Sequence, residues 1–282
     1  MDRKNKRAIL SQPKWEQKVI HEFETSRKAP TPALTDLMAE DDEAVLLKDQ
    51  RKFMSLNSLV MYGATRTYAE ILPATTKLAS KYNKATEADM KKLNRVAEYI
   101  YGCAGRHEYV LAPKSLQVIS CADAAYATHA DAKSHTGGTV GFESDESCWT
   151  GIISGKQSVV AKSTGEAELI AENKVGDLVE WKVQLMEELG YPQKTVIMLV
   201  DSTCAMNMVR NGTGSFKRAK HIKVRYFWLK DLIDDGIIKL EYQSTHELVA
   251  DILTKPLTGA QFQYLLYKLI GWNNESDDYN SE

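Results

Sequence analysis

The 282-residue sequence lacks the features that would assign it to several common classes. Its four cysteines form no Cys-x-x-Cys pair and have no zinc-ligand spacing, so neither a disulfide framework nor a zinc centre is expected. No run is apolar and long enough to cross a bilayer, so we expect no membrane partner. No apolar segment follows the basic start Met1–Arg7, and we therefore expect no signal peptide. Reduced thiols are typical of a cytoplasmic or nuclear protein.

A surplus of basic charge is also missing. The chain has 36 lysines and arginines against 38 acids, which gives a formal net charge of -2. The sum therefore does not identify a nucleic-acid-binding protein, and the distribution of charge along the chain is more informative.

The first part of the chain has the pattern of helices. Residues 1–48 are expected to form a leader and linker, because Pro30 and Pro32 interrupt regular structure there. Residues 49–108 are expected to form a small helical module, in which Thr86 begins a capping signal completed by Asp89. Its apolar stripes are typical of packing surfaces.

The pattern changes to strands near residue 109. Strand-like runs at 116–122, 137–142 and 148–162 are close enough together to form an antiparallel meander. A long helix that begins after Ser163, a strand at 195–201, two helices, a strand at 237–242 and terminal helices follow. This order predicts an α/β domain over 109–272, with a mixed five-stranded sheet, its first strand central, and helices on both faces. The acidic tail 273–282 is expected to be disordered.

Four carboxylates stand at element ends within this domain. Asp123 lies in the first strand, Glu168 in the first turns of the long helix, Asp201 at the end of the strand 195–201, and Asp251 in a short helix stopped by Pro256. No obvious cationic partner stands beside each of them. Acids that converge in this way repel one another unless a cation lies between them, and oxygen ligands suit Mg²⁺. The four acids therefore indicate a metal site suited to phosphodiester hydrolysis.

Each acid also has an ordinary structural explanation. Glu168 could favour the helix dipole, Asp201 could be the N-cap of the next helix, and Asp251 could be a surface residue. Periodicity alone leaves these alternatives open.

The motifs around the four acids resemble the ribonuclease H domain of copia-type retrotransposon polyproteins. They occur in the family's order. The matching segments are Asp123-Ala-Ala-Tyr126 with Lys133-Ser-His-Thr-Gly137, Ala161-Lys-Ser-Thr-Gly-Glu-Ala-Glu-Leu-Ile-Ala171, Val200-Asp-Ser-Thr-Cys-Ala205, Arg218-Ala-Lys-His-Ile-Lys-Val-Arg-Tyr226 and Ala250-Asp-Ile-Leu-Thr-Lys-Pro-Leu257. Upstream, residues 53–102 resemble the thumb and connection helices of the reverse transcriptase in these polyproteins.

This resemblance implies a catalytic and metal-binding set of Asp123, Glu168, Asp201 and Asp251. It also implies two Mg²⁺ ions, with Mn²⁺ as a substitute, and cleavage of the RNA strand of RNA–DNA hybrids. The rest of a retroelement polyprotein is an expected partner, and an active element would place the chain in a virus-like particle.

The chain departs from the family pattern in several places. It has Asp123-Ala-Ala-Tyr126 where the family usually has Asp-Ala-Asp-Trp, and Arg66-Thr-Tyr68 where it has Arg-Pro-Asp. No Tyr-x-Asp-Asp polymerase motif occurs, so DNA synthesis is not expected. The alternatives are a catalytically inactive or domesticated remnant that binds nucleic acid or protein, and a different nuclease on the same fold. The order of the acids argues against the latter.

Basic residues gather shortly after Asp201. They are expected to contact the nucleic-acid backbone, and the alternative is a solvated helix face. The histidines nearest the acids, His129, His135 and His246, are expected to be exposed. The basic residues are Arg210, Lys217, Arg218, Lys220, Lys223 and Arg225.

Overall fold

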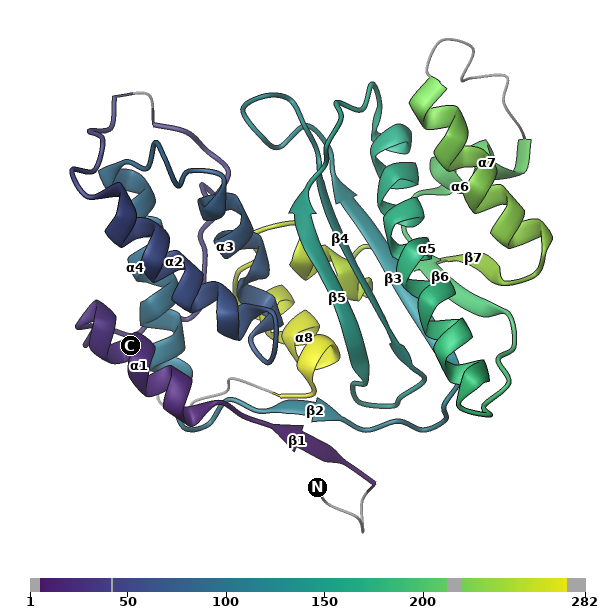
Figure 1. The fold of residues 1–282 in the computed structure, drawn as a ribbon, viewed down its shortest axis with the longest axis horizontal. Coiled ribbons are helices and arrows are strands. Elements are labelled where there is room, and N and C mark those ends of the chain that lie inside the picture. The colour runs from purple at the N-terminus through teal and green to yellow at the C-terminus, as the bar shows by residue number, and fades with distance from the viewer. Residues whose placement is uncertain (1–5, 42, 212–219, 273–282) are drawn as a thin grey trace. The chain divides into compact units, whose positions relative to one another are not determined.

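The computed structural model describes residues 6–41, 43–211 and 220–272, without the side chains of 210–226. The chain divides into two compact units (Figure 1). The first comprises Met1–Leu37, Asp41–Ala112 and Pro256–Glu282, and the second comprises Met38–Glu40 and Pro113–Lys255. These bounds differ from the expected ones: the first unit takes in the residues before 49 other than 38–40, as well as residues 109–112 and the last helix.

The first unit is a helical module with one small antiparallel ribbon. The ribbon pairs β1 with β2, so that Ile9 lies opposite Val110. The elements of this unit are β1 (Ala8–Leu10), α1 (Pro13–Phe23), α2 (Gln50–Ala64), η1 (Ala69–Ile71), α3 (Leu72–Ala79), α4 (Glu87–Cys103), β2 (Tyr109–Leu111) and α8 (Gly259–Ile270).

Local sequence signals place the ends of these helices. Thr86 accepts from the Asp89 backbone N–H, and Asp89 accepts from the Thr86 backbone N–H, so the expected capping box is confirmed at the start of α4. Pro73 stands in the first turn of α3, where a missing N–H costs no helical hydrogen bond.

Buried polar contacts join the expected leader to the helical module. Glu16 of α1 accepts from the Tyr68 hydroxyl at 2.8 Å and from the Gly105 N–H at 2.8 Å. Glu70 accepts from the Tyr99 hydroxyl at 3.0 Å and lies 2.9 Å from Nε2 of His107. Tyr68 replaces the acid of the family's Arg-Pro-Asp and is fully buried. The leader is therefore part of the core of this unit.

The second unit contains the mixed sheet. Its strand order is β5-β4-β3-β6-β7, in which β3 pairs antiparallel with β4 and parallel with β6. The central position of the first strand and the five-stranded mixed sheet are thereby confirmed. The elements are β3 (Val118–Ala125), β4 (His135–Phe142), β5 (Trp149–Lys156), α5 (Thr164–Glu188), β6 (Val196–Val200), α6 (Thr203–Asn211), α7 (Lys220–Asp234), β7 (Ile238–Tyr242) and η3 (Val249–Leu253).

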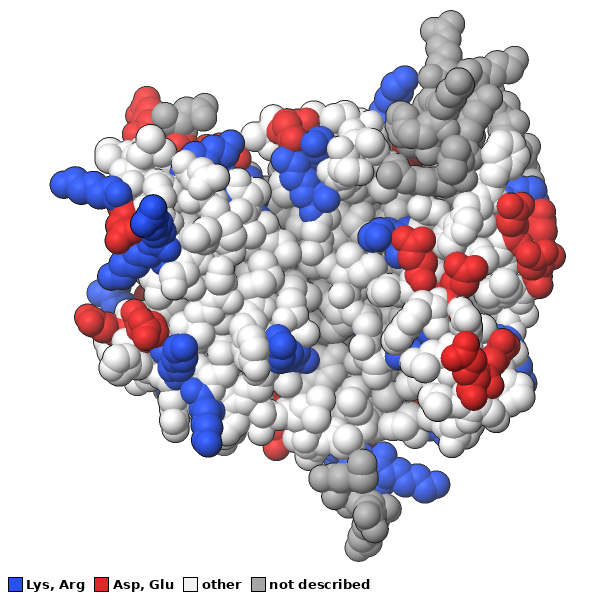
Figure 2. Space-filling view, in the orientation of Figure 1, with Lys and Arg blue, Asp and Glu red and all other residues white. Residues whose placement is uncertain are grey.

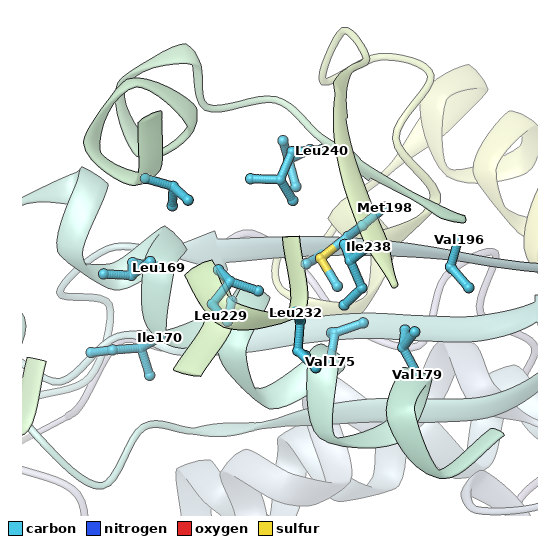
Figure 3. Close-up of a cluster of buried hydrophobic side chains, with 14 of the residues drawn as sticks. Leu169, Ile170, Val175, Val179, Val196, Met198, Leu229, Leu232, Ile238 and Leu240 are labelled. Atoms are coloured by element: carbon cyan, nitrogen blue, oxygen red, sulfur yellow. The ribbon is translucent and has the colours of Figure 1, made fainter. Parts of the chain in front are cut away.

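Helical segments cover both faces of this sheet. Neighbouring residues of a strand point to opposite faces. A Cβ added at Gly138 would lie 2.2 Å from Val175 of α5, whereas one at Gly137 would lie 2.5 Å from Thr254, next to η3. The α5 face holds an apolar core to which β6, β7 and α7 also contribute, as Figure 3 shows for Met198, Ile238 and Leu232. Among the described residues, no helix combines the length and hydropathy needed to cross a membrane.

Substitution of Gly138 tests how closely α5 packs on the sheet. Val175 is β-branched and stiff, so an added methyl must displace the helix or the strand. We expect G138A to lower the free energy of unfolding by roughly 1–3 kcal/mol, measured by urea denaturation. The control is G155A in the adjacent strand β5, where nothing lies within 4 Å of the added Cβ. Equal stability of the two variants would contradict this packing.

Candidate active site

Two of the four acids are brought together by the parallel strands. In the pairing of β3 with β6, Cys121 lies opposite Leu199. Asp123 follows Cys121 by two residues, and Asp201 follows Leu199 by two residues. Both acids therefore stand at the same end of the sheet, the carboxyl end of β3 and β6. Asp123 is 1% exposed, and Asp201 is partly exposed.

The long helix α5 adds Glu168 to this pair. Its N-cap Ser163 accepts from the Glu166 N–H, and the glycine at 138 lets the helix approach the sheet. Glu168 lies in the second turn and is 4% exposed. One carboxylate oxygen each of Asp123, Glu168 and Asp201 lies within 4.8 Å of the others.

The fourth acid comes from η3 on the opposite face of the sheet. Gly137 pairs with Asp123 across the strands, and its missing side chain leaves room for the segment that follows Ala250. Asp251 is 3% exposed, and the Thr254 hydroxyl donates to Oδ2 of Asp123. The segment 250–254 therefore lies beside Asp123.

The structural alternatives for these acids do not match their surroundings. The Ser202 hydroxyl accepts from the Ala205 N–H in the first turn of α6, whereas Asp201 accepts from the Thr245 hydroxyl at 2.6 Å. Glu168 and Asp251 are buried, whereas a helix-dipole residue or a surface residue would be solvated.

The expectation that these acids have no cationic partner is wrong for two of them. Lys255 forms an ion pair with Oδ1 of Asp251, and its Nζ lies 3.7 Å from Oδ2 of Asp123. The spacing of four residues between Asp251 and Lys255 brings their side chains to the same side of a helical turn. That spacing was visible in the motif. Within the part of the chain that the structure describes, no lysine or arginine is paired with Glu168 or Asp201.

Burial and mutual repulsion shift the protonation of these acids. Burial raises the pKa of Asp123 to about 6, although the charge of Lys255 opposes this shift. Burial, and then the charge of Asp123, raise the pKa of Glu168 well above its ordinary value. Burial also raises the pKa of Asp251, against the opposing charge of Lys255. A bound cation would relieve the repulsion and favour the ionised forms.

The donor set fits a hard divalent ion. Three carboxylate oxygens within 4.8 Å of one another are of the type that Mg²⁺ or Mn²⁺ binds. Asp123, Glu168 and Asp201 would hold such an ion, and Asp251 extends the set on the far side of Asp123. Among the side chains that the structure describes, one ammonium group faces four carboxylates, which leaves net negative charge for an ion to compensate.

A fifth acid near the site was missed by the sequence reasoning. Glu172 follows Glu168 by four residues, so both lie on one face of α5. It is 1% exposed, and neither of its carboxylate oxygens has a hydrogen-bond partner among the residues that the structure describes. Burial, and then the charge of Asp201, raise the pKa of Glu172 to about 8.

Two histidines lie deeper than expected. His129 and His135 are 4% and 0% exposed, and the Nε2 of His129 is 3.1 Å from the Nδ1 of His135. His135 also lies 2.9 Å from the Ser154 hydroxyl, which donates to the Leu253 carbonyl at 2.7 Å. These side chains are enclosed because His135 begins β4 under η3, so the expectation of exposure is wrong. His246 is exposed, as expected.

The expected nucleic-acid contacts lie outside the described side chains. This holds for Arg210, Lys217, Arg218, Lys220, Lys223 and Arg225. On the face shown in Figure 2, acidic and basic side chains of the described residues are interspersed, without a broad field of one sign.

Comparison with known proteins shows that the chain is similar in sequence to polyproteins of plant transposons. No family model matches the chain. It is 35% identical over 142 residues, half of its length, to the Retrovirus-related Pol polyprotein from transposon TNT 1-94 of Nicotiana tabacum. It is 25% identical over 247 residues, 87% of its length, to that from transposon RE1 of Arabidopsis thaliana. It spans only 10% and 16% of these two polyproteins.

Two solved structures illustrate the structural likenesses. The foamy viral protease-reverse transcriptase in complex with an RNA/DNA hybrid is 13% identical, with a TM-score of 0.49, and the match covers 88% of this chain and 29% of that one. The N-terminal RNase H domain of a Mycobacterium tuberculosis protein, solved as a fusion with maltose-binding protein, is 15% identical, with a TM-score of 0.34. That match covers 50% of this chain and 91% of the other. Because these TM-scores are below 0.5, the fold assignment rests on the strand order and the placement of the helices.

The sequence motifs, the sheet and the relatives agree. The second unit has a ribonuclease H-like fold, and a helical module precedes it. The expected resemblance is therefore confirmed: this chain is similar, over 87% of its length, to the Pol polyproteins of plant retrotransposons, in the manner of their reverse transcriptase and ribonuclease H region.

Proposed function

We propose that this chain is a metal-dependent endonuclease that hydrolyses the RNA strand of RNA–DNA hybrids. The observation that carries the proposal is the convergence of Asp123, Glu168 and Asp201 within 4.8 Å at one end of a ribonuclease H-like sheet. The printed description of one structural neighbour, with an RNA/DNA hybrid bound, names the same class of substrate.

The position of each acid in the cluster determines which proposed ion it could bind. Asp123 lies between the Glu168–Asp201 side and the Asp251 side, so it is the acid able to contact ions on both sides. When bound, two Mg²⁺ ions would supply an activated water and charge stabilisation for the leaving oxygen. The chain's own part is to hold the four carboxylates close together and largely away from bulk water.

Substrate binding is assigned to the basic residues between 210 and 225. Their phosphate contacts would be independent of sequence and sensitive to salt. Recognition of a hybrid through backbone geometry and 2′-hydroxyl groups would make cleavage largely independent of base sequence. The rest of a retroelement polyprotein would supply the polymerase, because the chain has no Tyr-x-Asp-Asp motif.

A second candidate function is favoured by one observation. Because Lys255 pairs with Asp251 and approaches Asp123, half of the acid set is partly neutralised. A domesticated domain that binds nucleic acid or protein without turnover would tolerate this pairing.

A cleavage assay separates the two candidates. The purified chain is incubated in Mg²⁺ with three duplexes of one sequence: end-labelled RNA paired with DNA, RNA paired with RNA, and DNA paired with DNA. We expect cleavage of the RNA in the hybrid alone. Binding of the hybrid without cleavage in Mg²⁺ or Mn²⁺, by a chain shown by circular dichroism to be folded, would support the second candidate.

A further inference from the structure

Lys255 holds an unusual position at the carboxylate cluster. Its ammonium forms an ion pair with Asp251 and lies 3.7 Å from Oδ2 of Asp123. The two carboxylate side chains are 5% and 1% exposed, whereas the side chain of Lys255 is 37% exposed. The acids are therefore fixed within the protein, and the lysine reaches them from its solvent side.

The charge compensation of the cluster is uneven. Lys255 faces the Asp123–Asp251 side, where the Thr254 hydroxyl also donates to Asp123. On the other side, Glu168 and Asp201 have no lysine or arginine partner among the residues that the structure describes, and Asp201 accepts only a neutral hydroxyl from Thr245. Among the described side chains, a cation that enters the cluster meets carboxylates without an ion-pair partner on one side and an ammonium on the other.

We propose that Lys255 is a resident cation that competes with a divalent ion for the Asp123–Asp251 side of the cluster. The first ion binds among Asp123, Glu168 and Asp201 without having to displace the ammonium from its ion pair with Asp251. A second ion binds at Asp251 only when the ammonium gives up that carboxylate. The two ion positions therefore differ in affinity, and Lys255 is the cause. This inference rests on the proposed function only in taking a divalent ion as the ligand of the cluster.

The side chain is suited to this exchange. A lysine ammonium is a compact charge on a flexible stem with four carbons, and it is readily hydrated when it leaves an ion pair. The partly exposed Lys255 can move into solvent without opening the core. In the absence of the second ion, its charge reduces the repulsion between Asp123 and Asp251, which are otherwise buried close together.

Binding of Mn²⁺ alone, measured by electron paramagnetic resonance of the free ion, tests the proposal without any cleavage assay. We expect two classes of site in the wild-type chain. K255M removes the charge and keeps an unbranched side chain. It should raise the affinity of the weaker site for Mn²⁺ about 10-fold, which is the factor that corresponds to an electrostatic perturbation of one pKa unit. The tighter site should change by less than about 2-fold, and K255R should behave like the wild type.

Two further variants make the outcome decisive. K239M removes an exposed lysine that pairs with Glu241, and it should leave both sites unchanged. D251N should abolish the weaker site and keep the tighter one, which locates that site at Asp251. If K255M does not fold, K255Q replaces it, and the same strengthening of the weaker site is expected. If K255M leaves the affinity of the weaker site unchanged, or eliminates that site, the proposed competition by Lys255 is wrong. The tighter metal site would still stand. Absence of Mn²⁺ binding by the wild-type chain overturns both this inference and the proposed metal dependence.

Discussion

D123N is expected to lower the rate of hybrid cleavage by about 10³-fold or more. Asp123 is the acid closest to both sides of the cluster, and its loss removes a ligand from each proposed ion position. A loss of about 4 kcal/mol in transition-state stabilisation, typical of removing metal-assisted charge stabilisation, corresponds to this factor. The measurement is the single-turnover rate on end-labelled RNA in a hybrid.

The substitution should not unfold the chain. Asparagine keeps the shape of the side chain and an acceptor for the Thr254 hydroxyl, and it removes one charge from a group of mutually repelling acids. The matched control is D145N, because Asp145 is exposed and pairs with the exposed Lys114. An equal residual rate in D123N and D145N would remove Asp123 from the mechanism.

The second large effect is a loss of stability of the metal-free chain as the pH rises. In the unfolded chain these acids release their protons near pH 4 to 4.5, about the ordinary values. In the folded chain burial raises the pKa of Asp123 to about 6 and of Glu172 to about 8. Between these limits the folded state binds more protons, so the stability that these acids contribute is complete below about pH 4 and falls as the pH rises. The fall continues beyond pH 8, because burial and the charge of Asp123 raise the pKa of Glu168 to about 10.

The size of this fall is on the order of 1.4 kcal/mol for each unit by which a buried group is shifted. Urea denaturation in a chelator, at several pH values, measures it. E172Q cannot ionise at this position, so we expect it to make the fall between pH 6 and 8 shallower, and the raised pKa of Glu168 accounts for the fall that remains. E180Q, on an exposed position of α5, should leave the pH profile unchanged. Mg²⁺ at 100 times its dissociation constant should raise the free energy of unfolding by about 2.7 kcal/mol, most clearly near pH 8. A flat wild-type profile would contradict the buried acids.

The sheet and the acid set could be predicted because their signals are local or ordered along the chain. The strand-like run that ends at Asp201 and the helix that begins after Ser163 each determine one part of the arrangement. Parallel pairing then places Asp123 and Asp201 at one end of the sheet. The two acids come close together because the order of the elements along the chain predicts that these strands are parallel neighbours.

The electrostatic surroundings of the site were harder to predict. Whether Lys255 points to Asp251 depends on its rotamer and on the path of η3 beside β4. The hydrophobic periodicity of the sequence predicts neither of these. Glu172 has the polarity of a surface residue, so a hydropathy pattern cannot reveal that α5 buries it. The burial of His135 likewise depends on η3, which reaches β4 from a distant part of the sequence.

The most direct test of the account is to locate the ions. In crystals of the chain grown with Mn²⁺, anomalous diffraction should show a peak among the carboxylate oxygens of Asp123, Glu168 and Asp201. A second peak at higher concentration should appear between Asp123 and Asp251, with Lys255 displaced. Crystals saturated with Mn²⁺ that lack any peak at these acids, with Lys255 still paired to Asp251, would contradict the metal centre on which the proposed hydrolysis depends.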